Sequence, residues 1–181
     1  MSRGLGDVYK RQMHNIVYTR VDDTDNYAQI YQSDLCGWVG KLGYEKEDAW
    51  FSNVYTAEQA EFLSAAGFYA TGVDTQYEIY VCENFTDSSS LKQGLKKVAS
   101  GSFVNEGYYT VDFDEMVKIE AGQKFAVVVK IKTPNEKKPV AVEYSSDYYT
   151  KTVNITDGEG YVSADGQEWV NTESTLSLIH I

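Results

Sequence analysis

The side chains that enzymes most often use as nucleophiles and proton acceptors are scarce in this sequence. Its 181 residues include two cysteines, Cys36 and Cys82, and two histidines, His14 and His180. Cys-His and Ser-His catalysis both need an imidazole held beside the nucleophile to take its proton. Both histidines lie near the ends of the chain, and no catalytic motif surrounds either cysteine. We therefore expect no catalytic residue in this chain.

Acidic residues offer a second kind of chemistry, because a glycosidase needs two carboxylates about 5 to 9.5 Å apart. The chain has 27 Asp and Glu residues, so pairs at that separation arise easily by chance. Zinc is disfavoured, since the sequence has no Cys-x-x-Cys motif and no paired histidines. A glycosidase is therefore the least favoured interpretation.

Aromatic residues are better candidates for a binding role. Exposed rings stack on the C–H faces of sugars, since each ring is an apolar plate with a polar rim. The aromatic residues in or beside predicted loops are Trp38, Tyr144, Tyr148, Tyr149 and Tyr161. We take Trp38, Tyr148, Tyr149 and Tyr161 as candidate ligand-binding residues. The commoner alternative is that each ring packs beneath its own loop.

The chain is acidic, with a formal net charge of −11 and a pI of about 4.6. A nucleic-acid surface needs clustered Lys and Arg, so this class of partner is excluded. Solubility is the simplest explanation of the acidity, and calcium-binding loops are the sharper one. No apolar run approaches the roughly 20 residues of a membrane-spanning helix. One disulfide between the two cysteines is open, because spacing alone cannot decide it.

Residues 125–132 form the longest apolar, β-branched run, and the other elements must be arranged around it. Side chains on a strand alternate between two faces. This alternation places Phe125, Val127, Val129 and Ile131 on one face, which we expect to be buried. The other face ends in Lys130 and Lys132, which reach water. Such a strand needs partner strands on both edges and a second layer over its apolar face.

About ten short strands and almost no helix are predicted, which indicates an all-β fold, a two-sheet antiparallel β-sandwich of jelly-roll type. The segment 34–48 is expected to be a loop around Trp38, and 84–93 a polar loop. Strands 97–103 and 107–113 are expected to pair. A hairpin at 163–169 resembles the Asp-box of sialidases and many β-proteins, whose role is structural. The predicted strands are residues 50–56, 62–71, 76–83, 97–103, 107–113, 116–120, 125–132, 139–144, 160–163 and 168–171.

The two ends do not fit the chain between them. Residues 1–12 are basic in an acidic chain and show no strand or helix period, and they resemble a translated sequencing adapter. Residues 176–181 resemble the matching scar. We therefore expect non-native tails at 1–12 and 176–181, a linker with the first strands at 13–33, and one β-sandwich domain at 34–175.

Several ordered segments carry a resemblance to a known family: residues 25–34, 49–57, 67–69, 77–81, 107–112, 121–130 and 139–144. Together they resemble the lectin-like domain that follows the catalytic domain in secreted bacterial papain-like (C1 family) cysteine peptidases. The similarity extends from about residue 15 to residue 169. It implies a jelly-roll module, C-terminal to a missing peptidase domain that would carry the catalytic Cys, His and Asn.

The resemblance also implies a role, a location and a metal. The role would be that of a non-catalytic accessory module, which positions the peptidase domain and contacts cell-wall glycan or substrate. The location would be outside the cell or on the surface of a Gram-positive bacterium. Members of the family can hold a structural calcium ion, for which Asp34 and Glu143 are the candidate ligands here. The alternative is a stand-alone carbohydrate-binding module that uses loop aromatics.

Overall fold

The computed structural model describes residue 18 and residues 26–32, 37–144 and 159–173. The chain divides into two compact units, Met1–Tyr31 and Gln32–Ile181. In the first unit, residues 26–31 form a bend followed by irregular backbone. The tails predicted at 1–12 and 176–181 lie outside the described residues. All elements below belong to the second unit.

The described part of the second unit is built almost entirely from β-strands. One short 3₁₀ helix, η1 (Ser88–Lys92), interrupts them. The strands are β1 (Gly40–Leu42), β2 (Asp48–Thr56), β3 (Glu61–Ala70), β4 (Thr75–Cys82), β5 (Lys96–Phe103), β6 (Gly107–Ile119), β7 (Lys124–Lys132), β8 (Val140–Val142), β9 (Gly160–Ser163) and β10 (Trp169–Asn171).

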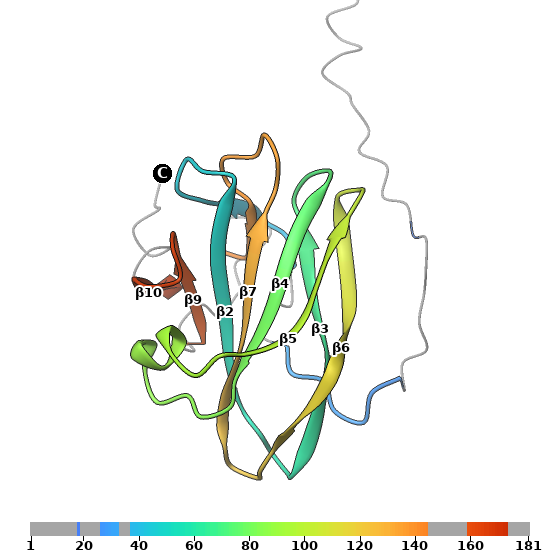
Figure 1. Ribbon diagram of the computed structural model, residues 1–181, viewed down its shortest axis with the longest axis vertical. Coiled ribbons are helices and arrows are strands. Elements are labelled where there is room, and N and C mark those ends of the chain that lie inside the picture. The colour runs from blue at the N-terminus through green and yellow to red at the C-terminus, as the bar shows by residue number, and fades with distance from the viewer. Residues whose placement is uncertain (1–17, 19–25, 33–36, 145–158, 174–181) are drawn as a thin grey trace, which may run out of the picture. The chain divides into compact units, whose positions relative to one another are not determined.

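These strands form antiparallel sheets, which confirms the predicted all-β class. The largest sheet has six strands in the order β10-β9-β2-β7-β4-β5, and Figure 1 shows β2, β7 and β4 side by side at its centre. Strands β3 and β6 form a second sheet, and β1 pairs with β8. As expected, β7 has a partner on each edge: β2 on one side and β4 on the other. The β2–β7 pair encloses the β3–β6 pair in the sequence, a nesting typical of jelly-roll winding.

The β3–β6 pair is the second layer over the apolar face of the six-stranded sheet. Phe68 of β3 lies between the layers, and its ring centroid is 6.1 Å from Phe51 of β2 and 5.5 Å from Tyr77 of β4. Phe103 of β5 stacks on Tyr109 of β6 at 3.8 Å. Aromatic pairs at these separations stabilise a packed core beyond the area they bury. The contacts confirm the predicted two-layer sandwich.

The expected pairing of strands 97–103 and 107–113 is wrong. Strand β5 pairs with β4, and β6 pairs with β3 in the opposite layer. The turn between β5 and β6 is held by the neighbouring β3–β4 turn, because the backbone N–H of Asp74 donates to the carbonyl of Val104 at 3.1 Å. The chain therefore crosses between layers here, and the strand predicted at 116–120 is the end of a continuous β6. The loop predicted at 34–48 likewise contains β1.

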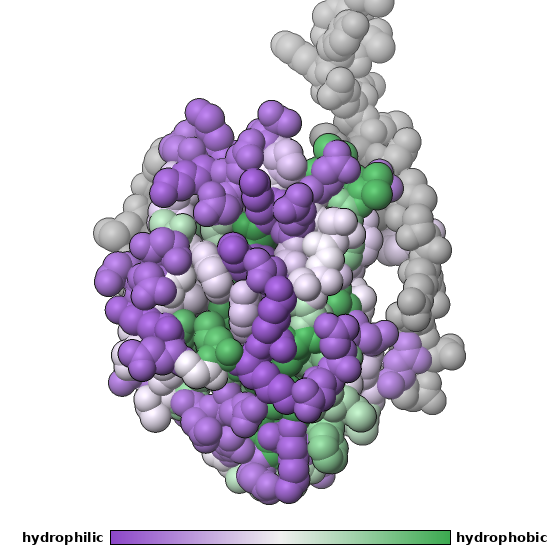
Figure 2. All heavy atoms as spheres, in the orientation of Figure 1, coloured by the Kyte–Doolittle hydropathy of each residue, from purple (hydrophilic) through white to green (hydrophobic). Residues whose placement is uncertain are grey.

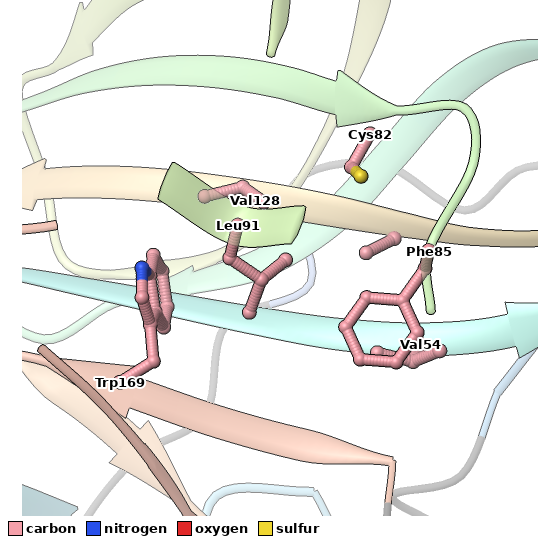
Figure 3. Close-up of a cluster of buried hydrophobic side chains, with 7 residues drawn as sticks. Val54, Cys82, Phe85, Leu91, Val128 and Trp169 are labelled. Atoms are coloured by element: carbon pink, nitrogen blue, oxygen red, sulfur yellow. The ribbon is translucent and has the colours of Figure 1, made fainter. Parts of the chain in front are cut away.

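The outer face of the six-stranded sheet, which points away from β3 and β6, has an apolar end that the chain itself covers. The segment between β4 and β5 folds over it and places Phe85 and Leu91 against Val54 and Val128, with Trp169 alongside (Figure 3). Leu91 is fully buried although it lies in a Ser-rich segment predicted to be a polar loop. Strand β7 is consequently apolar on both faces over most of its length, and Ala126 and Val128 are as buried as Phe125.

Cys82 lies at the edge of this covered end as a buried free thiol. Its Sγ donates to the carbonyl of Ser90 at 3.5 Å, and burial raises the pKa of the thiol. A thiol held in its neutral form is a poor nucleophile, so its role is packing. Cys36 lies outside the described residues. Across the part of the chain that the structure describes, there is no helix with the length and apolarity needed to cross a membrane.

Candidate functional site

The outer face of the β3–β6 sheet carries aromatic side chains that point away from the core. Phe68 and Tyr109 are opposite each other in the register and point inward. Since side chains alternate along a strand, the next pair, Tyr69 and Tyr108, points outward. Their rings contact edge to face, with centroids 4.9 Å apart. Tyr108 is 58% exposed, so this pair presents a ring to solvent.

Trp38 extends this pair into a line of three rings, which we call the aromatic row: Trp38, Tyr69 and Tyr108. The Trp38 ring lies 5.9 Å from that of Tyr69, at an interplanar angle of 60°. Two of the three come from strands, so their positions are fixed by the sheet register. Rings placed by strands need little ordering when a ligand binds, which favours affinity.

Two glycines leave room for the row. Gly67 lies opposite Thr110 on the outward face of β3, and a Cβ there would overlap the Tyr108 hydroxyl. A Cβ at Gly37 would lie 2.7 Å from the Tyr69 Oη, and its φ of +66° favours glycine in any case. The hydroxyl end of each tyrosine therefore lies close to a glycine, where the backbone carries no side chain.

A charged group closes one end of the row. The Lys41 ammonium lies 5.3 Å from the centroid of the Trp38 ring, a cation–π distance. It also donates to the carbonyl of Thr71 at 3.0 Å and pairs with Glu136. This lysine holds the pKa of Glu136 below its usual range. The arrangement places apolar plates beside fixed charges and hydroxyls.

The sequence-predicted ligand residues are not gathered in one place. Trp38 belongs to the aromatic row. Tyr161 of β9 packs against Phe85 at 5.6 Å, partly buried at the covered end of the six-stranded sheet. Tyr148 and Tyr149 lie outside the described residues. Tyr69 and Tyr108 were missed because only aromatics in or beside loops were considered, although both lie in predicted strands.

The calcium prediction stays a prediction. Asp34 lies outside the described residues. Glu143 lies just after β8 and is half-buried. Over residues 37–144 and 159–173, no group of three or more His, Cys, Asp or Glu side chains is placed to hold a metal ion. Calcium takes six to eight oxygen ligands, which include backbone carbonyls and waters as well as carboxylates.

The hairpin at 163–169 has the expected turn geometry. The Ser163 Oγ accepts from the backbone N–H of Gly166 at 2.9 Å, and an Asp165 carboxylate oxygen accepts from that of Gln167 at 2.8 Å. The backbone N–H groups of Gln167 and Glu168 both donate to this carboxylate and lower the pKa of Asp165. The Trp169 indole N–H donates to the carbonyl of Gly166 at 3.1 Å, so the ring packs beneath the turn. The motif is structural here.

Comparison with known proteins gives a family and two similar structures. A family model described as "Lectin like domain" matches residues 30–180. One structure of the clostridial cysteine protease Cwp84, after propeptide cleavage, superposes with a TM-score of 0.65 at 24% identity, covering 80% of this chain and 35% of that one. A second, of the cysteine protease and lectin-like domains of Cwp84 from Clostridium difficile, gives 0.60 at 27%, covering 73% and 30%.

The chain thus spans about a third of the length of these structures. No curated protein matches it. The family match covers most of the chain and includes every strand described above. This chain belongs to the lectin-like domain family.

Proposed function

We propose that this chain is the non-catalytic lectin-like module of a surface-associated papain-like cysteine peptidase, and that it contacts glycan through the aromatic row. The two similar structures carry a cysteine protease domain in the same chain as their lectin-like fold. One of them is described as a surface layer associated protein. A peptidase domain of the same parent chain is therefore the proposed partner, and an extracellular or surface location is the proposed setting.

The aromatic row is the observation that carries the glycan contact. Its three rings follow one another across the outer face of β3 and β6, at centroid distances of 4.9 and 5.9 Å. A sugar ring that stacks on Tyr108 buries its C–H face, while its hydroxyls stay available to water and to the polar rim. Lys41 and Glu136 offer a donor and an acceptor to the hydroxyls of a sugar unit at the Trp38 end of the row.

Glycan binding can be tested with purified cell-wall polysaccharide fragments and the Tyr108→Ala variant. We expect binding to weaken about tenfold, because truncating an aromatic side chain that anchors a ligand costs more than about 1 kcal/mol. Phe62→Ala is the matched control: Phe62 is an exposed aromatic at the far end of β3, 60% exposed and opposite Lys118 of β6. This control should bind as the parent does. Equal losses in both variants would remove the aromatic row from the proposal.

The non-catalytic role has a separate test. The chain on its own should not hydrolyse casein or any of the glycan fragments used above. Hydrolysis that survives purification by two independent affinity steps would contradict the accessory role and favour the glycosidase alternative. A stand-alone carbohydrate-binding module would instead bind glycan normally but be encoded without a Cys, His and Asn peptidase domain upstream.

A further inference from the structure

A second polar surface lies on the outer face of the six-stranded sheet, at the end that no described segment covers. Strands β7, β4 and β5 run side by side there, and their register forms two rungs. One rung consists of Lys130, Glu78 and Ser100, and the other of Lys132, Gln76 and Ser102. Adjacent strands are about 4.8 Å apart, and residues two apart on a strand are separated by about 6.6 Å. The six side chains therefore form a compact grid.

The grid is held rigid at Glu78. One carboxylate oxygen accepts from Lys97 of β5 at 2.8 Å and from the Tyr80 hydroxyl at 2.7 Å, and the other accepts from Lys130 at 3.2 Å. These contacts, with that to Lys97 the strongest, lower the pKa of Glu78 to about 2. Lys130 also lies 5.5 Å from the centroid of the Trp50 ring. Two ammonium groups are thus anchored by one carboxylate, and each keeps further N–H donors.

The charge of this surface is opposite to that of the molecule. Lys97, Lys130 and Lys132 share this part of the face with two carboxylates, that of Glu78 and that of Asp48, which lies opposite Lys132 on β2. This leaves a local excess of one positive charge in a chain of net charge −11. The same residues line an open groove of about 460 Å³, together with Gln76, Ser100 and Ser102. In Figure 2 the side of the molecule over β2, β7, β4 and β5 is mostly hydrophilic. An acidic protein that keeps a positive groove selects anions there and repels them elsewhere.

We propose that this groove binds an acidic saccharide, with the carboxylate or phosphate of a sugar unit on Lys132 and Lys130. The uncharged side chains of the grid, Gln76, Ser100 and Ser102, would bond the sugar hydroxyls. Lysine holds such anions as a point charge with three donors. A neutral sugar would leave the lysines unused.

This surface goes beyond the proposed glycan contact, because it lies on the other sheet and uses no residue of the aromatic row. The two proposals therefore fail independently. Tyr108→Ala should leave acidic-saccharide binding at the grid unchanged. Lys132→Gln should leave binding at the aromatic row unchanged.

The test uses the full chain and three probes: oligogalacturonate, a glycerol phosphate oligomer and a neutral galacto-oligosaccharide. Binding is followed by amide NMR shifts and titration calorimetry at two salt concentrations. We expect at least one acidic probe to shift the amides of Gln76, Ser100 and Ser102, with affinity that falls as salt rises. The neutral probe should not. Which acidic probe binds tells whether the groove takes a carboxylate or a phosphate.

Lys132→Gln should weaken the acidic probe about tenfold, as loss of a direct charge contact does. Lys124→Gln is the matched control, because Lys124 lies at the opposite end of β7, pairs with Thr56 in the register and loses the same charge. It should bind within twofold of the parent. The proposal is overturned if no acidic probe shifts the grid amides, if the neutral probe binds equally well, or if both lysine variants weaken binding alike.

Discussion

The outer face of the six-stranded sheet is buried at one end and reaches solvent at the other, although β4 and β7 contribute to both ends. At one end of the outer face of the six-stranded sheet, Val54, Ala126 and Val128 are buried beneath Phe85 and Leu91. At the other end, two to six residues further along β7, Lys130 and Lys132 reach solvent. The difference is in the cover: the segment between β4 and β5 reaches the first end only.

This contrast separates stability from binding within one surface. The covered end stabilises the sandwich, because burial there removes apolar area from water at about 25 cal/mol per Å². The open end contributes little burial and instead holds fixed charges. Trp50 lies at the boundary, stacked on Tyr80 with centroids 5.6 Å apart and beneath Lys130. Variants at the cover, the boundary and the open end should therefore have progressively smaller effects on stability.

Leu91→Ala should have the largest effect. Leu91 is fully buried, with 0% solvent exposure. Truncating a buried leucine to alanine costs about 2 to 5 kcal/mol, because apolar contacts are lost and a cavity remains. Urea unfolding followed by tryptophan fluorescence measures the loss. Lys92→Ala, in the same short helix but exposed, should change stability by less than about 0.5 kcal/mol. A loss below 1 kcal/mol at Leu91 would mean that η1 does not cover the sheet in solution.

Gly166→Ala tests the boundary. Gly166 has a φ of +75°, and a Cβ there would lie 2.9 Å from the Trp50 ring. We expect a loss of about 2 kcal/mol, of which roughly 1 comes from the left-handed backbone and the rest from the clash. Gly94→Ala separates the two, since Gly94 has a φ of +70° and nothing within 4 Å of its Cβ position. Equal losses of stability at both glycines would show that the Trp50 ring moves aside with no loss of free energy.

The strands could be predicted from the sequence more accurately than the β4–β5 segment that covers them. Alternation along 125–132 and 76–83 placed Ile79, Val129 and Ile131 correctly in the core, because a strand's period is local. Leu91 was missed because a single leucine among serines has no period, and its burial depends on the distant β2, β7 and β10. The β5–β6 pairing was wrong for a similar reason: a short connection favours a hairpin, and only the three-dimensional contact between Asp74 and Val104 shows the crossing.

The functional surfaces were partly predictable for the same reason. Trp38 was identified as a binding candidate, but its neighbours Tyr69 and Tyr108 meet through the pairing of β3 with β6, which are far apart in the sequence. The polar grid likewise needs three strands in register. Residue type indicates which side chains suit a ligand, and only register shows which of them lie together.

Glu78→Gln, at the open end, should have the smallest effect on stability and a distinctive dependence on pH. The Glu78 side chain is 32% exposed, and it faces Lys97, Lys130 and Tyr80. Solvent screens these contacts, so we expect a loss of about 1 kcal/mol at neutral pH. The pKa of Glu78 is lowered from 4.5 to about 2 in the folded chain. The unfolded state therefore takes up a proton first as the pH falls, and this part of the stability is present above about 4.5 and lost between 4.5 and 2.

The glutamine variant has no carboxylate to protonate at position 78. Its stability should therefore fall less than that of the parent between pH 4.5 and 2. Unfolding midpoints at pH 6, 4 and 2.5 measure the difference. Glu115→Gln is the control: Glu115 pairs with Lys96 at 3.2 Å, but its side chain is 74% exposed, and its removal should leave the pH dependence of the parent intact. Parallel curves for Glu78→Gln and the parent would show that Glu78 is not fixed by its lysines. The open end would then lack the anchoring of Lys130, one of the two lysines on which acidic-saccharide binding is proposed.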